Sequence, residues 1–139
     1  MNKKTLATIL YFIDKRGGAT VTELMKLAYL ADLIVSKGDV KRKITDFDYV
    51  RWHYGPFDKS IYSCLERLSK NDLIDSKIDY TVQGSEAITY VSKGRLNSSE
   101  GLTEGERQSL DNLLSQVGGL GPVGLTKLAY ATYPLKRMG

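Results

Sequence analysis

Apolar residues recur with helical spacing over the first quarter of the chain. One buried helical face, in the i, i+3, i+4, i+7 pattern, is formed by Leu6, Ile9, Leu10 and Ile13. This pattern predicts a helix over residues 4–15, ended by Gly17-Gly18. The stretch Thr20–Glu23 has the form of a capping box and predicts a second helix that runs to about Ser36. The second helix is apolar almost all round, which is typical of a helix at the centre of its domain.

The middle of the chain changes from strand-like to helical patterning. Residues 44–54 are rich in β-branched and aromatic side chains and predict a short strand or extended segment. Gly55-Pro56 breaks that segment, and because proline is tolerated in a first turn, the pair is also a suitable helix start. A helix is therefore predicted over residues 57–70, with Asn71 ending it in the left-handed conformation. Its apolar face consists of Phe57, Ile61, Cys64, Leu65 and Leu68.

The last third of the chain predicts a hairpin followed by helices. Apolar and polar residues alternate over 78–82 and 88–90, on either side of a turn at Gln83-Gly84-Ser85. A second capping box at Thr103–Glu106 opens a helix that buries Leu110, Leu113, Leu114 and Val117. A last short helix follows Pro122. The sequence therefore predicts one mainly helical α+β domain over residues 1–139, with about five helices, a small β-hairpin and a winged-helix-like central part.

Composition limits the cellular location and the partners that this domain can have. The 139 residues are 42% hydrophobic and 26% charged, as in ordinary globular proteins. No apolar run reaches the ~20 residues that span a bilayer, since Lys26 and Asp32 interrupt the longest, so no membrane contact is expected. The single cysteine, Cys64, excludes an internal disulfide and fits a cytoplasmic location. The net charge of +4 permits an acidic protein partner or a nucleic acid and requires neither.

The residues that could support catalysis are few. His53 is the only histidine and is expected to be a partly buried ring, and Cys64 is expected to be a small core residue. Residues 119–124 match the dinucleotide fingerprint in form, but a predicted helix precedes them where a strand is needed. No cluster of ligands suits a metal ion. We therefore expect no enzyme activity, no metal and no cofactor.

DNA binding is an alternative that the sequence leaves open. A helix followed by a hairpin suggests a winged helix, whose helix would enter the major groove. Its exposed face would carry Lys59, Ser63, Arg67 and Lys70. However, Glu66 lies within that face, and the hairpin turn at residues 83–86 has no Lys or Arg to bind a phosphate.

Two motifs together resemble a known family. The stretch Leu24–Asp32 contains Lys-Leu-x-Tyr-x-Ala on a central helix, and Tyr54-Gly55-Pro56 follows about 25 residues later, before a leucine-spaced helix. In this order and spacing they resemble the Panacea domain of SocA-like antitoxins, which are often phage-associated. The resemblance is strongest over residues 4–75. The C-terminal part, 102–134, departs from it: Tyr130 stands four residues before Pro134-Leu135, where relatives tend to have a histidine before Pro-Trp.

The resemblance implies an antitoxin that neutralises a co-encoded toxin by direct protein contact. Some relatives instead act as adaptors that deliver the toxin to an ATP-dependent protease. The toxins paired with this domain are of many unrelated kinds, so the family does not name the partner.

Residue chemistry suggests where such a partner would bind. Tyr, Trp and Arg supply large contact area in interfaces, and they are concentrated between residues 51 and 57. Tyr54 and Pro56 are expected to pack inside, whereas Arg51, Trp52 and Phe57 are candidates for partner contact. Tyr29 and Asp32 of the second helix complete the predicted site. A buried acid needs a partner, and we expect a cation from the Arg51 segment to neutralise Asp32.

Overall fold

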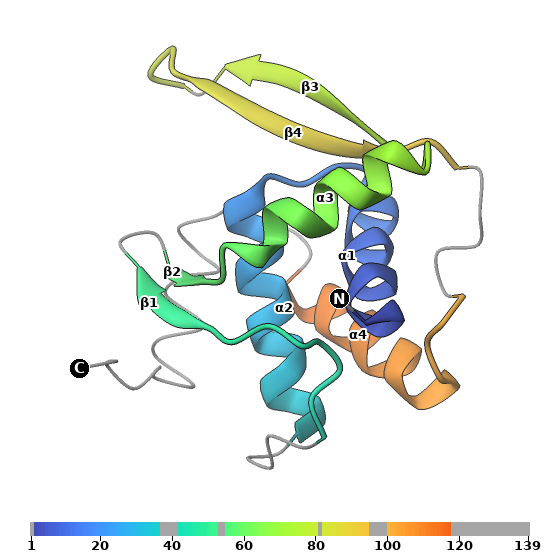
Figure 1. The fold of residues 1–139 in the computed structure, drawn as a ribbon. Helices are drawn as coiled ribbons and strands as arrows, with labels where there is room; N and C mark the ends of the chain where they lie inside the picture. Colours follow the sequence, from blue (N-terminus) through green and yellow to red (C-terminus); the bar gives the residue numbers. More distant parts are fainter. Residues whose placement is uncertain (1, 37–41, 53–54, 81, 95–99, 118–139) are drawn as a thin grey trace.

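The computed structural model describes residues 2–36, 42–52, 55–80, 82–94 and 100–117. Within these ranges the chain forms four helices and two antiparallel strand pairs (Figure 1). The elements in chain order are α1 Lys3–Arg16, α2 Val21–Ser36, β1 Val50–Trp52, β2 Gly55–Phe57, α3 Ser60–Lys70, β3 Ile74–Tyr80, β4 Glu86–Ser92 and α4 Glu104–Val117. The predicted α+β class is confirmed. The predicted fifth helix, after Pro122, lies outside the described residues.

The first two helices form where their local signals predict them. At the start of α1, Asn2 accepts a hydrogen bond from the Thr5 amide at 2.7 Å, and at its end Gly17 takes the left-handed conformation with φ 72°. Before α2, the capping box forms in both directions. The Thr20 amide donates to Glu23 at 3.0 Å, and the Glu23 amide donates to the Thr20 hydroxyl at 3.3 Å.

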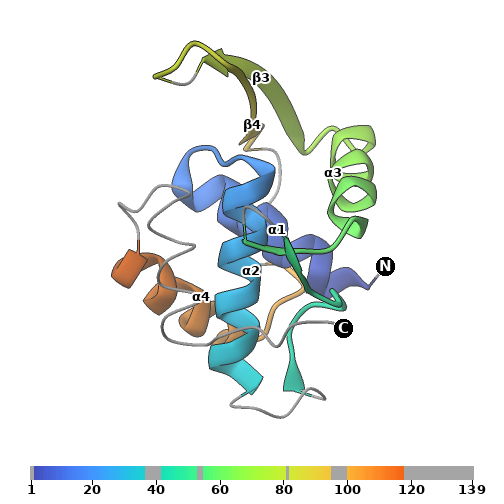
Figure 2. The same cartoon turned by 90° about the vertical axis from the view of Figure 1, so that its left-hand side faces the viewer.

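α2 is the centre of the domain. Every residue from Leu24 to Asp32 is buried, as expected for a helix that is apolar on all sides. Figure 2 shows α2 between α3 and α4, with α1 crossing behind it. The core therefore surrounds one helix. Surface residues that pack against α2 are held by the most buried element of the domain.

The segment between α2 and α3 differs from its prediction. Within the described part of the predicted 44–54 strand, Val50–Trp52 is in a strand, whereas residues 44–49 form irregular chain. The side chains of Ile44, Thr45, Phe47 and Tyr49 are buried, and those of Asp46 and Asp48 are exposed. Gly55-Pro56 does not begin a helix: it starts β2, which pairs with β1 in the register Arg51 to Pro56. The helix begins only at Ser60, where the carboxylate of Asp58 accepts hydrogen bonds from the Ser60 amide and hydroxyl at 2.9 and 2.8 Å.

α3 and the second hairpin follow the predicted pattern with one correction. The helical face Ile61, Cys64, Leu65 and Leu68 is buried as predicted. Asn71 is not left-handed, with φ −84°; the chain instead turns at Asp72, with φ 62°. β3 and β4 pair antiparallel with Ile78 opposite Ile88, which confirms the hairpin. The helix-then-hairpin order is present, but the winged-helix likeness stays a prediction.

α4 closes the core from the other side of α2. Its capping box forms as predicted, with the Thr103 amide donating to Glu106 at 2.9 Å. Leu110, Leu113 and Val117 are buried, and Leu114 packs against the core while partly exposed. Two side-chain contacts join α4 to α1: an ion pair between Lys4 and Glu106 at 2.9 Å, and a hydrogen bond from the Tyr11 hydroxyl to Asp111. None of the helices described is long and apolar enough to cross a membrane.

Candidate partner-binding site

Three aromatic side chains form a row on the surface beside the β1–β2 hairpin. The Phe57 ring lies between the rings of Trp52 and Tyr62, with centroid distances of 5.8 and 6.1 Å. Trp52 and Tyr62 are each 54% exposed, although they are large apolar groups that proteins usually cover. We call Trp52, Phe57 and Tyr62 the aromatic row.

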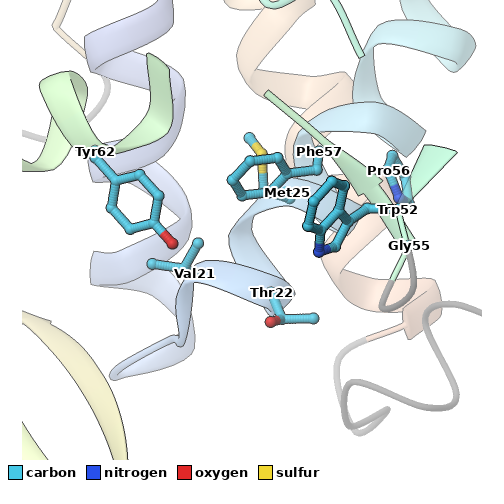
Figure 3. A pocket seen from close by; sticks show the side chains of 8 residues that line it. All are labelled: Val21, Thr22, Met25, Trp52, Gly55, Pro56, Phe57 and Tyr62. Carbon is cyan, nitrogen blue, oxygen red and sulfur yellow. The ribbon is translucent and has the colours of Figure 1, made fainter. Parts of the chain in front are cut away.

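A pocket of about 310 Å³ opens under the aromatic row (Figure 3). Its floor comes from the first turn of α2, and its lining residues are Val21, Thr22, Met25, Trp52, Gly55, Pro56, Phe57 and Tyr62. In Figure 3 the rings of Trp52 and Phe57 lie beside each other near Met25, and Tyr62 reaches in from α3. The lining is mainly apolar and carries no ionisable group other than the tyrosine phenol. Such a pocket suits an apolar side chain better than a charged ligand.

The hairpin holds its position through close contact with α2. Gly55 and Pro56 are both buried, and the Asp58 amide donates to the Met25 sulfur at 3.2 Å. Gly55 has φ 122°, and a Cβ on it would lie 2.8 Å from Cε of Lys26. Only glycine fits this close approach without displacing a neighbour. Lys26 is itself only 2% exposed, and burial lowers its pKa to about 8.

Asp32 joins α2 to the irregular segment before β1. Its carboxylate accepts hydrogen bonds from the Ile44 and Thr45 amides at 2.9 and 3.0 Å, from the Thr45 hydroxyl, and from the Tyr49 hydroxyl at 2.6 Å. Burial raises the pKa of Asp32, against the opposing effect of these hydrogen bonds. The cation that acts on Asp32 is Lys43, whose charge lowers the pKa of the carboxyl, and not a residue of the Arg51 segment. The hydrogen bonds come from amides and hydroxyls, because the chain folds residues 44–49 over the carboxylate.

The five predicted partner-binding residues divide between surface and core. Arg51 and Trp52 are exposed, and Phe57 is partly exposed. Tyr29 and Asp32 are only 4% and 3% exposed, and Tyr29 stacks edge-on against Tyr49 at 5.3 Å. They support the segment that leads into β1 and present no surface to a partner.

Two contributors to the pocket were missed from the sequence. Tyr62 follows Phe57 by five positions, a spacing that does not share a face if both residues are in one helix. Because Phe57 is in β2 and not in α3, the two rings meet after all. Met25 was counted among the residues that make the second helix apolar almost all round; it is buried, yet it also borders the pocket. Assigning Gly55-Pro56 to a strand pair, and not to a helix start, would have brought Tyr62 next to Phe57 in the prediction.

The four residues considered for DNA contact lie on the exposed side of α3. Lys59, Ser63, Arg67 and Lys70 are all exposed. Lys70 forms an ion pair with Glu66 at 3.0 Å, one turn earlier on the same helix. The nearby hairpin tip presents the apolar Val82, fully exposed, and no basic residue. The face therefore offers weak positive charge to a phosphate backbone.

The reactive groups singled out in the sequence do not come together in the part of the chain that the structure describes. Cys64 is fully buried, and burial raises the pKa of its thiol to about 12, so it stays protonated at neutral pH. Among the described residues, no three His, Cys, Asp or Glu side chains come together to hold a metal ion. His53 and the glycine-rich stretch 119–124 lie outside the described residues.

An α+β domain with an exposed aromatic row over an apolar pocket has the features of a protein-binding module. In a comparison with family models, residues 24–133 match the family described as "Antitoxin SocA-like, Panacea domain". The match covers more than half of the chain, and the chain belongs to this family. It includes α2 from Leu24 onward, both strand pairs, α3 and α4. Neither the curated proteins nor the solved structures gave a match.

Proposed function

We propose that this protein neutralises a co-encoded toxin by binding it directly through the aromatic row and its pocket. Membership of the SocA-like antitoxin family supports the antitoxin role. The observation that carries the binding mode is the exposure of Trp52 and Tyr62, each 54%, at the rim of an apolar pocket supported by α2. The protein acts by occupancy and performs no chemical step.

The composition of this surface resembles the energetic centre of protein interfaces. Tyr, Trp and Arg contribute most of the binding energy in such centres, and here Arg51 is exposed on the strand that carries Trp52. A rigid pocket next to a cluster of rings accepts one apolar side chain of a partner and covers it. The net charge of +4 also favours approach by an acidic toxin.

Two other modes of action lead to different experimental results. If the protein is an adaptor for an ATP-dependent protease, the toxin is bound in the same way but disappears from cells that contain the protease. If it is a DNA-binding regulator, the exposed side of α3 with Arg67 and Lys70 binds operator DNA, and this binding weakens steeply with added salt. An interface made of aromatic contacts weakens far less.

Co-expression with the neighbouring open reading frame tests the proposal. The wild-type protein should rescue growth from the toxic product and co-purify with it. Trp52→Ala and Tyr62→Ala should each weaken the complex by about 2 kcal/mol or more, which is roughly thirtyfold in Kd by calorimetry. Val82→Ala, which removes a fully exposed apolar side chain far from the pocket, is the matched control and should bind like the wild type.

The result can contradict the proposal in clear ways. If both aromatic variants still rescue growth and bind with wild-type Kd, the aromatic row is not the toxin site. If the neighbouring product is harmless and the purified protein shifts its own promoter DNA with a steep salt dependence, DNA regulation replaces toxin binding as the main function.

A further inference from the structure

The β3–β4 hairpin carries several large apolar side chains that are exposed. It extends away from the helices in both views (Figures 1 and 2). Ile78 and Tyr80 of β3 are 65% and 68% exposed, and Ile88 of β4 is 51% exposed. Ile78 and Ile88 are opposite each other in the register and so lie on the same face. A two-stranded ribbon with such a face is marginally stable when isolated.

Hydrogen bonds show which edge of the hairpin is available. Tyr90 of β4 exchanges two backbone hydrogen bonds with Ala19, at 2.8 and 3.0 Å, so its polar groups point away from β3. Backbone direction alternates along an antiparallel pair. Ser76, which is opposite Tyr90, therefore directs its N–H and C=O away from β4, and so do Ile78 and Tyr80. Among the described residues, β4 alone pairs with β3.

The charges on β3 are complementary to those on a second, antiparallel copy of the same strand. In an antiparallel pair of two β3 strands centred on Ile78, Lys77 of each copy is opposite Asp79 of the other. The outward-facing residues pair as well, Ile78 with Ile78 and Ser76 with Tyr80. A centre on Lys77 instead would place lysine opposite lysine and Asp75 opposite Asp79. Opposite charges stabilise cross-strand pairs and like charges destabilise them.

We propose that two copies of this protein associate through the outer edges of β3, with the two-fold axis at Ile78, to form a continuous four-stranded antiparallel sheet. The sheet would carry a row of four isoleucines across its centre, from Ile88 and Ile78 of each copy. Because the strands run in opposite directions, the helical bodies lie at opposite ends of the sheet. The aromatic row stays open to a toxin.

Local hydrogen bonds show what changes on pairing. In the single chain the Ser76 amide donates to the Asp75 side chain at 2.8 Å, and the Tyr80 amide donates to the Asp79 side chain at 3.2 Å. In the dimer these amides bond to the second copy, which releases the Asp79 carboxylate to meet Lys77 of that copy. One strand pair is a small interface, so a Kd in the micromolar range is expected.

Sedimentation velocity of the purified full chain over a range of concentrations tests the dimer. Wild-type protein should show a monomer–dimer equilibrium. Lys77→Asp and Asp79→Lys should each raise the dimer Kd about tenfold or more, which is ~1.4 kcal/mol, because each places like charges in opposition. An equimolar mixture of the two variants restores both opposite-charge pairs and should dimerise like the wild type. A wild-type chain that stays monomeric, single variants that dimerise normally, or a mixture that fails to recover would each overturn the register.

Oxidative cross-linking gives a second test that does not depend on affinity. Ile78→Cys places two thiols at the two-fold axis, within disulfide range, and should form a covalent dimer. Ser76→Cys is the control, because that residue faces Tyr80 of the other copy and should not cross-link. The background is low, since the only natural cysteine, Cys64, is buried. Equal cross-linking of both variants would contradict the proposal. Toxin rescue is a separate readout, so either proposal can fail alone.

Discussion

Replacing Gly55 with alanine should destabilise the protein strongly, because two separate costs arise at one position. Gly55 has φ 122°, where a side chain adds about 1–3 kcal/mol of backbone strain. The new Cβ would also lie 2.8 Å from Cε and 3.4 Å from Cγ of Lys26. Forcing a methyl group into a packed site costs about 1–3 kcal/mol. The sum is about 2–6 kcal/mol, a large part of a typical domain stability of ~5–15 kcal/mol.

Urea unfolding measures this change, and Trp52, the only tryptophan, provides the fluorescence signal next to the mutated hairpin. Gly84→Ala is the matched control: Gly84 has φ 84° in the β3–β4 turn, and an added Cβ meets nothing within 4 Å. It should therefore show the backbone cost alone. The double variant Gly55→Ala/Lys26→Ala should recover part of the steric cost, which a double-mutant cycle reports. If Gly55→Ala is no more destabilising than Gly84→Ala, close packing against Lys26 does not hold the hairpin.

Two further changes test the buried charges of α2. Asp32→Ala leaves the Ile44 and Thr45 amides and the Tyr49 hydroxyl buried without an acceptor. It should lower the free energy of unfolding, measured by urea titration, by about 3–5 kcal/mol. The exposure of Trp52 in the folded state should stay unchanged. Lys26 has its pKa lowered from 10.5 to about 8, so the unfolded chain binds its proton more tightly. Its contribution makes stability rise between about pH 8 and pH 10.5, and Lys26→Met should remove that rise in a pH series of urea titrations; an unchanged series would refute it.

Elements with local signals were predictable from the sequence. The capping boxes at Thr20 and Thr103, and the helical spacing of the residues that follow each, placed α2 and α4 closely. Gly55-Pro56 was misassigned because in isolation the pair suits a helix start better than a strand. In the structure it pairs with β1 and packs closely against Lys26, which is distant in the sequence. Local patterning cannot contain that contact.

The candidate site was predictable only in part for the same reason. Trp52 and Phe57 were identified by their chemistry, and both border the pocket. Tyr29 and Asp32 were included in the partner site, although a buried or half-buried position was already expected for the acid, and both are in fact almost fully covered. Their burial depends on residues 44–49 folding over α2, where Thr45 and Tyr49 supply hydroxyls. Tyr62 was missed because its contact with Phe57 requires the hairpin.

The contacts between α1 and α4 have a consequence for synthesis of the chain. Lys4 and Glu106 are 102 positions apart in the sequence, and Tyr11 and Asp111 are 100 apart. Long-range contacts of this kind form late, because a large loop must close first. While the chain is on the ribosome, α1 and α2 are therefore made well before the helix that covers them. Completion of the core waits until Val117 has left the exit tunnel, so the faces of α1 and α2 that α4 covers stay open while the residues between them and α4 are being made.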